Sequence, residues 1–184
     1  MNKLKLIVGV IILAWMSAVI AANRSPYIQK MPNRQWAEII LIQRYRLDAE
    51  YADILSKVIE TASEQESVPV ETIISVMAVE SKFDPKAVSP CGAIGLMQVK
   101  PETWDGKQPY NIHDKYENVF AGAWVLHNYK NELQSDRQAI MAYNIGITHF
   151  RQGKAMGSAK IYYDNVSKER RAIITNYPKF ISTL

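Results

Sequence analysis

The sequence is poor in several features that define whole classes of proteins. Its 184 residues contain a single cysteine, which excludes an intramolecular disulfide framework and a cysteine-rich zinc site. It contains no internal repeat, no low-complexity linker and no alternating apolar and polar pattern long enough to predict a β-strand. The three histidines, His113, His127 and His149, lack metal-ligand spacing, so we expect neither a metal nor another cofactor.

The excess of positive over negative charge is also small. The chain has 22 Lys and Arg residues against 18 Asp and Glu residues, a formal net charge of +4. This weak excess fits nucleic acid, a membrane surface or an acidic cell-wall polymer equally well. The hydrophobic fraction of 48% is that of one ordinary globular domain, which excludes a disordered chain and a polytopic membrane protein.

The N-terminus has the pattern of an export signal. Two lysines precede an unbroken apolar run over residues 6–22, and the polar stretch Asn23-Arg24-Ser25-Pro26 follows. The run is intermediate in length between a signal-peptide core and the roughly 20 residues of a transmembrane helix. Residues 1–22 are therefore predicted to be either a signal peptide, cleaved after Ala21 or Ala22, or an inner-membrane anchor. Either route predicts a periplasmic location, free or membrane-anchored, and argues against nucleic acid as a partner.

The remainder of the chain is predicted to be mainly α-helical. Apolar residues recur at helical spacing over residues 33–47, 48–66, 70–79, 117–131, 136–143 and 160–174, and a further helix is expected near Thr103. The segment 70–79 is apolar nearly all round, so we expect it to be the central helix, surrounded by the others.

Glu80 directly follows this expected central helix. Partial desolvation and the negative end of the helix dipole both raise the pKa of a carboxyl group in that position. Such a group suits proton donation to a leaving group near neutral pH. A glutamate at a helix end is more often an ordinary solvated residue, so its interpretation depends on the sequence that follows.

The run ESKFDPKAVSPCGAIGLMQ, from Glu80 to Gln98, resembles the signature of the soluble lytic transglycosylase family. Further matches follow in the expected order: Pro101 and Thr103, Asn118-Val119 with Gly122-Ala123, the run Ala142-Tyr143-Asn144-Ile145-Gly146, and Tyr162 with Val166. The resemblance covers roughly residues 48 to 170 and implies a mainly α, lysozyme-like fold close to goose-type lysozyme. It divides the chain into an export segment (1–22), a connecting segment with a first helix (23–47) and one catalytic domain (48–184).

The family resemblance implies one catalytic carboxylate, Glu80. Such enzymes cleave the β-1,4 bond between N-acetylmuramic acid and N-acetylglucosamine in peptidoglycan and leave a 1,6-anhydro ring on the muramic acid. Because the attacking hydroxyl belongs to the substrate, the second carboxylate of ordinary glycosidases is not needed. Asp84, Asp105 and Asp114 are the nearest candidates for one, but Asp84 is expected in a turn and Asp114 at a helix cap.

The resemblance also implies supporting roles near Glu80. Tyr143 takes the position whose hydroxyl points at the catalytic glutamate, and Asn144 would line the same cleft. Ser81 would bind near the glutamate or the N-acetyl group, with a helix-end role as the alternative. Tyr162 would contact substrate, although packing explains it equally.

Three residues of the loop after Glu80 are further predicted substrate contacts. Met97 and Gln98 correspond to residues that line the cleft, and Gly95 would let the backbone approach the sugar closely. Two departures from the family pattern bear on substrate binding: Ser158-Ala159 stands where a Glu-Thr pair is usual, and Ile145 replaces a small residue. Cys91 lacks a neighbouring base and is interpreted as a packing residue.

An exported peptidoglycan lytic transglycosylase is thus the function that the sequence favours. Its partner would be the glycan strands, and its setting a secretion, conjugation or pilus assembly that needs a local gap in the wall. A muramidase that uses water and a non-catalytic wall-binding assembly protein remain alternatives. A nucleic-acid binder is disfavoured because basic residues do not cluster with interleaved aromatics.

Overall fold

A computed structural model describes residues 27–102, 104, 110–178 and 180–183. The expected export segment 1–22, the expected helix at Thr103 and the carboxylate candidate Asp105 lie outside these residues. Within them, no helix combines the length and the apolar character needed to cross a membrane.

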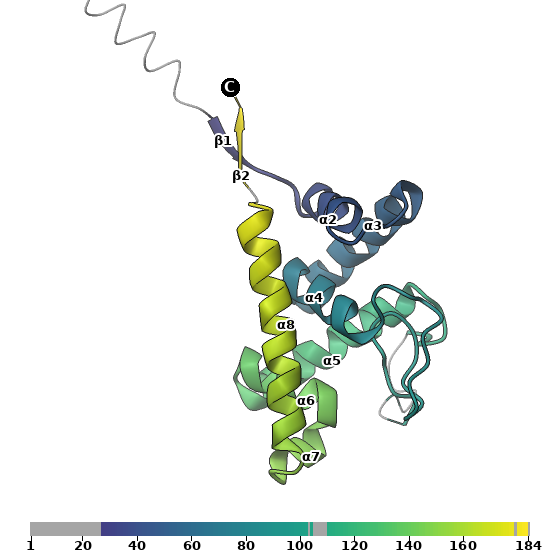
Figure 1. Cartoon of the computed structure of the whole chain (residues 1–184). Helices are drawn as coiled ribbons and strands as arrows, with labels where there is room; N and C mark the ends of the chain where they lie inside the picture. The colour runs from purple at the N-terminus through teal and green to yellow at the C-terminus, as the bar shows by residue number, and fades with distance from the viewer. Residues whose placement is uncertain (1–26, 103, 105–109, 179, 184) are drawn as a thin grey trace, which may run out of the picture. The chain divides into compact units, whose positions relative to one another are not determined.

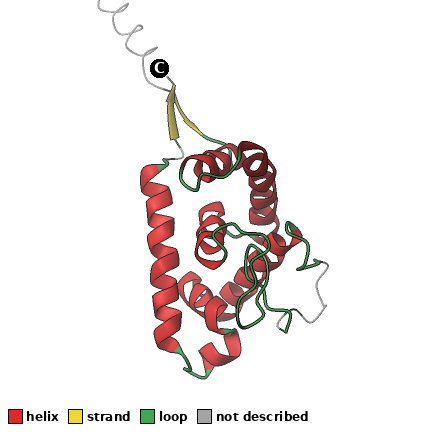
Figure 2. Ribbon diagram, turned by 45° about the vertical axis from the view of Figure 1, so that its right-hand side comes forward, coloured by secondary structure: helices red, strands yellow, loops and turns green. Residues whose placement is uncertain are grey.

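The residues from Pro32 to Pro178 form one compact helical unit. Helices make up most of it, with a long loop between α4 and α5 (Figure 2). The helices are α2 (Asn33–Gln43), α3 (Ala49–Glu66), α4 (Val70–Glu80), α5 (Glu117–Leu133), α6 (Asp136–Ile145), α7 (Ile147–Arg151) and α8 (Met156–Asn176) (Figure 1). The expectation of a mainly α fold is confirmed.

Two short strands belong to a second unit. In it, β1 (Tyr27–Lys30) and β2 (Phe180–Thr183) pair antiparallel, with Tyr27 opposite Thr183 and Lys30 opposite Phe180. The sequence analysis predicted no strand here, because four residues are too few to show an alternating pattern. Pairing between distant parts of the chain, not local preference, defines these strands.

The expectation that α4 is the central helix is confirmed. It packs against α2, α3 and α8, and it buries nearly every residue from Val70 to Met77. Ile73, Ile74 and Met77 are completely inaccessible to solvent. Because α4 is enclosed on several sides, the position of its last residue, Glu80, is fixed at the edge of the core.

The loop between α4 and α5 is held by Asn118, a fully buried residue of α5. Its Oδ1 accepts a hydrogen bond from the Met97 N–H at 2.8 Å, and its Nδ2 donates to the carbonyl oxygens of Ile94 and Ile112 at 3.0 and 2.9 Å. Gly95 lies against this amide: a Cβ atom there would be 2.6 Å from Asn118 Nδ2, and its φ is +75°. The loop can therefore reach Asn118 only with glycine at position 95.

Candidate active site

Glu80 lies in the wall of a cleft of about 460 Å³. Four predicted site residues line this cleft: Glu80, Gln98, Tyr143 and Asn144. They come from the end of α4, from the loop that Asn118 holds, and from the end of α6. The structure thus brings together residues from separate parts of the predicted signature.

The surroundings of Glu80 favour its protonated form. The side chain is mostly buried at the end of α4, and the Tyr162 hydroxyl donates a hydrogen bond to its Oε1 at 2.7 Å. Burial raises the pKa of Glu80 to about 7, and it outweighs the Tyr162 hydrogen bond and the Lys100 charge, which both lower the pKa. Near neutral pH this carboxyl group can therefore both give and take a proton.

The hydroxyl that contacts Glu80 belongs to Tyr162, not to Tyr143 as the resemblance implies, and Tyr162 does not line the cleft. The Tyr143 hydroxyl donates to the main-chain oxygen of Met97 at 2.8 Å, whereas the buried Tyr162 of α8 donates to Glu80. Tyr143 is still close enough for the Glu80 charge to add to the burial that raises the pKa of Tyr143. Tyr162 is consequently the tyrosine that contacts the candidate acid.

Ser81, Gly95 and Met97 lie outside the lining of the cleft. The Ser81 hydroxyl donates to the Leu96 carbonyl oxygen at 2.8 Å and accepts from the Phe83 N–H at 3.1 Å, as a helix-end role requires. Met97 is completely buried, and Gly95 faces Asn118. In the structure these three residues shape the loop that forms one wall of the cleft.

Gln98 joins that loop to the cleft. Its φ is 50°, and its Nε2 donates to the carbonyl oxygens of Ala87 and Gly95 at 3.0 and 2.9 Å. The loop thus occupies the amide nitrogen, which leaves the amide oxygen as the polar atom that Gln98 can offer to a ligand.

Several residues of the cleft were not predicted from the sequence. Cys91, interpreted as a packing residue, is instead exposed and lines the cleft. Lys100 and Glu102 extend the loop wall, Tyr129 comes from α5, and His149 comes from α7. Lys100 and Glu102 follow the signature run and alternate with the further matches Pro101 and Thr103, so they could have been found from their position just after Gln98. No sequence pattern marks Tyr129 or His149, which reach the cleft only through helix packing.

The structural roles expected for Asp84 and Asp114, in a turn and at a helix cap, are confirmed. Asp84 Oδ1 accepts from the Lys86 N–H in a turn, and Asp114 Oδ1 accepts from the N–H groups of Tyr116 and Glu117 at the start of α5. Among the described residues that line the cleft, Glu102 is the one carboxylate besides Glu80, and it is exposed. No group of three or more His, Cys, Asp or Glu side chains suited to a metal occurs in the described ranges.

Comparisons with known proteins identify the family of the chain. A family model described as "Transglycosylase SLT domain" matches residues 57–165, more than half of the chain. The membrane-bound lytic murein transglycosylase C of Haemophilus influenzae (strain PittEE) is 27% identical over 87% of this chain and 54% of its own length. The transglycosylase of Enterobacteria phage PRD1 is 28% identical over 64% of this chain and 43% of its own length. The chain thus spans about half the length of these curated relatives.

A solved structure shares the fold. The 70 kDa soluble lytic transglycosylase of Escherichia coli superposes with a TM-score of 0.59, at 18% sequence identity, over 79% of this chain and 29% of its own. Glu80, Gln98, Tyr143, Asn144 and Tyr162 all fall inside the matched residues 57–165. On the evidence of the family match and the fold, the chain belongs to the transglycosylase SLT domain family.

Proposed function

We propose that the chain is a peptidoglycan lytic transglycosylase. It cleaves the β-1,4 bond between N-acetylmuramic acid and N-acetylglucosamine and forms 1,6-anhydro-N-acetylmuramic acid. The observation that carries this proposal is Glu80: a largely buried carboxyl group with a pKa of about 7, hydrogen-bonded to Tyr162 and open to a cleft of about 460 Å³. The relatives named lytic murein transglycosylases support the same reaction.

Glu80 serves as acid and then as base. Its proton passes to the glycosidic oxygen as the bond from that oxygen to C1 of the muramic acid breaks. The resulting carboxylate takes the proton of the C6 hydroxyl group as the C6 oxygen bonds to C1. No water is consumed, and Glu80 ends protonated as it began. Tyr162 stabilises the carboxylate that exists between the two steps, because hydrogen bonds to a charged oxygen are strong.

The remaining polar residues of the cleft are proposed to bind the glycan. Asn144 is exposed on its wall, Gln98 offers its amide oxygen, and Tyr143 holds the main chain of Met97 beside both. Export through residues 1–22 and action beside a secretion, conjugation or pilus assembly complete the proposal. The family resemblance supports this setting, and co-purification with envelope proteins tests it.

A water-using muramidase is the second candidate, and one observation favours it: Glu102 also lines the cleft. Inverting glycosidases use a second carboxylate to activate water. The two reactions differ in their products, since hydrolysis leaves a reducing end and transglycosylation leaves an anhydro ring.

Mass spectrometry of muropeptides released from purified sacculi tests the proposal. The wild-type chain should release anhydro-muropeptides, and Glu80→Gln should lower the rate by about 10²- to 10⁴-fold, the usual contribution of general acid–base catalysis. Reducing ends in place of anhydro products would establish the muramidase. Full activity of Glu80→Gln would refute the role of Glu80 in either reaction.

A further inference from the structure

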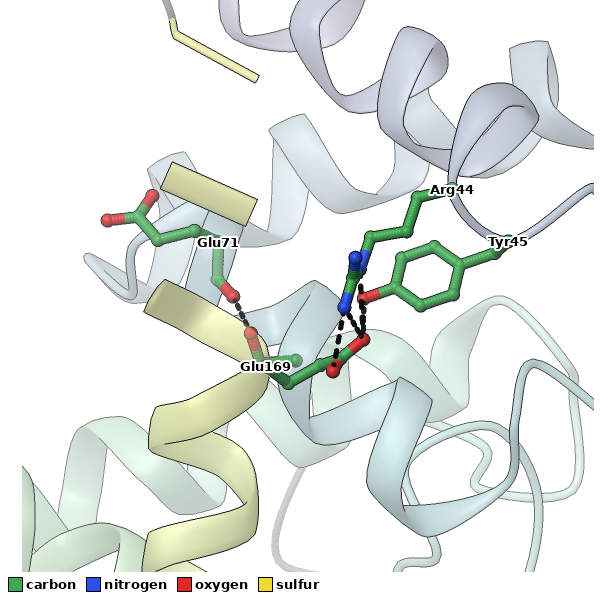
Figure 3. A network of polar contacts seen from close by, with 5 residues as sticks. Arg44, Tyr45, Glu71 and Glu169 are labelled. Atoms are coloured by element: carbon green, nitrogen blue, oxygen red, sulfur yellow. Dashed lines mark hydrogen bonds and ion pairs between the residues drawn. The ribbon is translucent and has the colours of Figure 1, made fainter. Parts of the chain in front are cut away.

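A polar cluster about two helical turns from Tyr162 joins α2 to α8. Figure 3 shows Arg44 and Tyr45 pointing at the carboxylate of Glu169. Arg44 donates from Nε and Nη2 at 2.9 to 3.0 Å and reaches both carboxylate oxygens, and the Tyr45 hydroxyl donates to Oε1 at 2.7 Å. The Arg44 and Glu169 side chains are only 24% and 23% exposed, so their geometry is more restrained than that of a surface ion pair.

This cluster also contacts the turn that follows Glu80. The Tyr45 ring packs on the ring of Phe83, with centroids 4.5 Å apart. Phe83 is 4% exposed, and its N–H donates to the Ser81 hydroxyl. Tyr45 therefore touches α8 through its oxygen and the turn after Glu80 through its ring.

On α8, the same cluster lies on the face that reaches Glu80. Glu169 follows Tyr162 by seven residues, two helical turns, so both side chains project from one side of the helix. The neighbouring Arg170 donates to Glu71 in the first turn of α4 at 3.3 Å. Contacts from α8 thus reach both ends of α4, at Glu71 and at Glu80.

These contacts form a closed circuit that begins and ends at Glu80. It runs from Glu80 through the turn to Phe83, across to Tyr45, on to Glu169, and along α8 to Tyr162, whose hydroxyl donates to Glu80. We propose that Arg44 and Tyr45 are positioning residues for the candidate acid: by holding Glu169, they fix α8 at the height where Tyr162 meets the Glu80 carboxylate. This inference deepens the proposed function and rests on it for the role of Glu80.

The positioning residues lie outside the part of the chain that the family match covers. Residues 57–165 include Glu80 and Tyr162, whereas Arg44, Tyr45 and Glu169 flank that range on both sides. None of the three lines the cleft. They can therefore act on the reaction only through the geometry of Glu80, which predicts an effect on kcat and on the pKa of Glu80 without an increase in KM.

The titration of Glu80 reports this geometry directly. The groups that face it are Tyr162 from α8, Tyr143 from α6 and Lys100 from the loop, and Tyr129, Glu102 and His149 line the same cleft. Tyr162 is the group whose hydrogen bond lowers the pKa of Glu80. If α8 shifts enough to lengthen this bond while Glu80 stays buried, the pKa of Glu80 rises.

The experiment is a carbon-13 NMR titration of the Glu80 carboxyl group in the full chain, with the resonance assigned by its loss in Glu80→Gln. Glu169→Gln should raise the pKa of Glu80 by about half a unit or more, less than the one to two units expected when the Tyr162 hydroxyl is removed. Tyr45→Phe keeps the ring on Phe83 and removes only the hydroxyl, so it should give a smaller shift in the same direction and a well-folded protein. If Glu169→Gln fails to fold because Arg44 has lost its carboxylate partner, the Tyr45→Phe titration alone tests the positioning role.

Asp53→Asn is the matched control, because it removes the ion pair between Arg34 of α2 and Asp53 of α3, which ties α2 to α3 instead of α8. It should leave the titration unchanged. A wild-type pKa in both Glu169→Gln and Tyr45→Phe would overturn the inference, as would an equal shift in Asp53→Asn. The titration needs no substrate, so a chain that releases no anhydro-muropeptides but shows these shifts would refute the proposed function and leave the positioning role standing.

Discussion

Removal of the Tyr162 hydroxyl is the sharpest test of how the fold prepares Glu80. Tyr162→Phe keeps a ring of nearly the same volume in a position that is 6% exposed, and it deletes the donor that lies 2.7 Å from Glu80 Oε1. Hydrogen bonds to a charged group contribute about 1.5 to 3 kcal/mol. Because 1.36 kcal/mol corresponds to one pKa unit, the pKa of Glu80 should rise by about one to two units above its value of about 7.

This shift has a definite sign in both activity and stability. The alkaline limb of kcat/KM, where Glu80 loses its proton in the free enzyme, should move to higher pH, and the plateau should fall by up to about 10- to 100-fold because the developing carboxylate loses its donor. In the wild-type chain the pKa of Glu80 is raised from 4.5 to about 7, so the native state binds this proton more tightly than the unfolded state. The resulting stabilisation, about 3 kcal/mol, is complete below pH 4.5 and is lost as the pH rises through 7. In Tyr162→Phe the loss should extend one to two pH units further.

The assays are a pH–rate profile on solubilised glycan strands and urea unfolding at pH 4.5, 7 and 9. Tyr163→Phe is the matched control, because Tyr163 is the next residue on α8 and its ring lies under Arg137 instead of beside Glu80. An alkaline limb that stays in place in Tyr162→Phe, or moves equally in Tyr163→Phe, would show that the Tyr162 contact does not set the pKa of Glu80.

Two further substitutions test the cleft and the loop. Glu102→Gln should retain at least about half of the wild-type release of anhydro-muropeptides, since one carboxylate suffices for transglycosylation; a loss of 100-fold or more would assign Glu102 a catalytic role. Gly95→Ala should lower the free energy of unfolding by about 2 kcal/mol or more, because its Cβ would lie 2.6 Å from Asn118 Nδ2 and its φ is +75°. Urea unfolding checks this, with Gly92→Ala as the control, since a Cβ there has open space at a similar φ of +78°.

The helices were predictable because the spacing of their apolar residues can be read from consecutive residues in the sequence. The segment 70–79 was expected as the central helix, and α4 runs from Val70 to Glu80 among three neighbours. Helix ends were less predictable. The first helix was expected to extend to residue 47 but stops at Gln43, and Arg46 adopts a φ of 60°, which no residue type at that position signals. α8 begins at Met156, ahead of the expected residue 160, and includes Gly157, which favours helix poorly.

The candidate site was predictable in its composition but not in its contacts. The motif identified Glu80, Gln98, Tyr143 and Asn144, which the fold brings to one cleft. Which tyrosine bonds to Glu80 depends on how α8 and α6 pack around α4, and no local pattern encodes that choice. The same holds for Gly95. Only glycine fits at this position, because a Cβ atom would collide with Asn118, which lies more than twenty residues later in the sequence.

The hydrogen bond from Tyr162 to Glu80 joins residues 82 positions apart, and the donor belongs to α8, the last helix among the described residues. A chain that has not yet docked α8 exposes Glu80 to water, where its pKa is the ordinary 4.5 and the group is ionised at neutral pH. Such a chain has no proton to give to a glycosidic oxygen. Under the proposed function, a chain in which α8 is not docked would therefore be inactive, and glycan cleavage would require α8 to be packed beside Glu80.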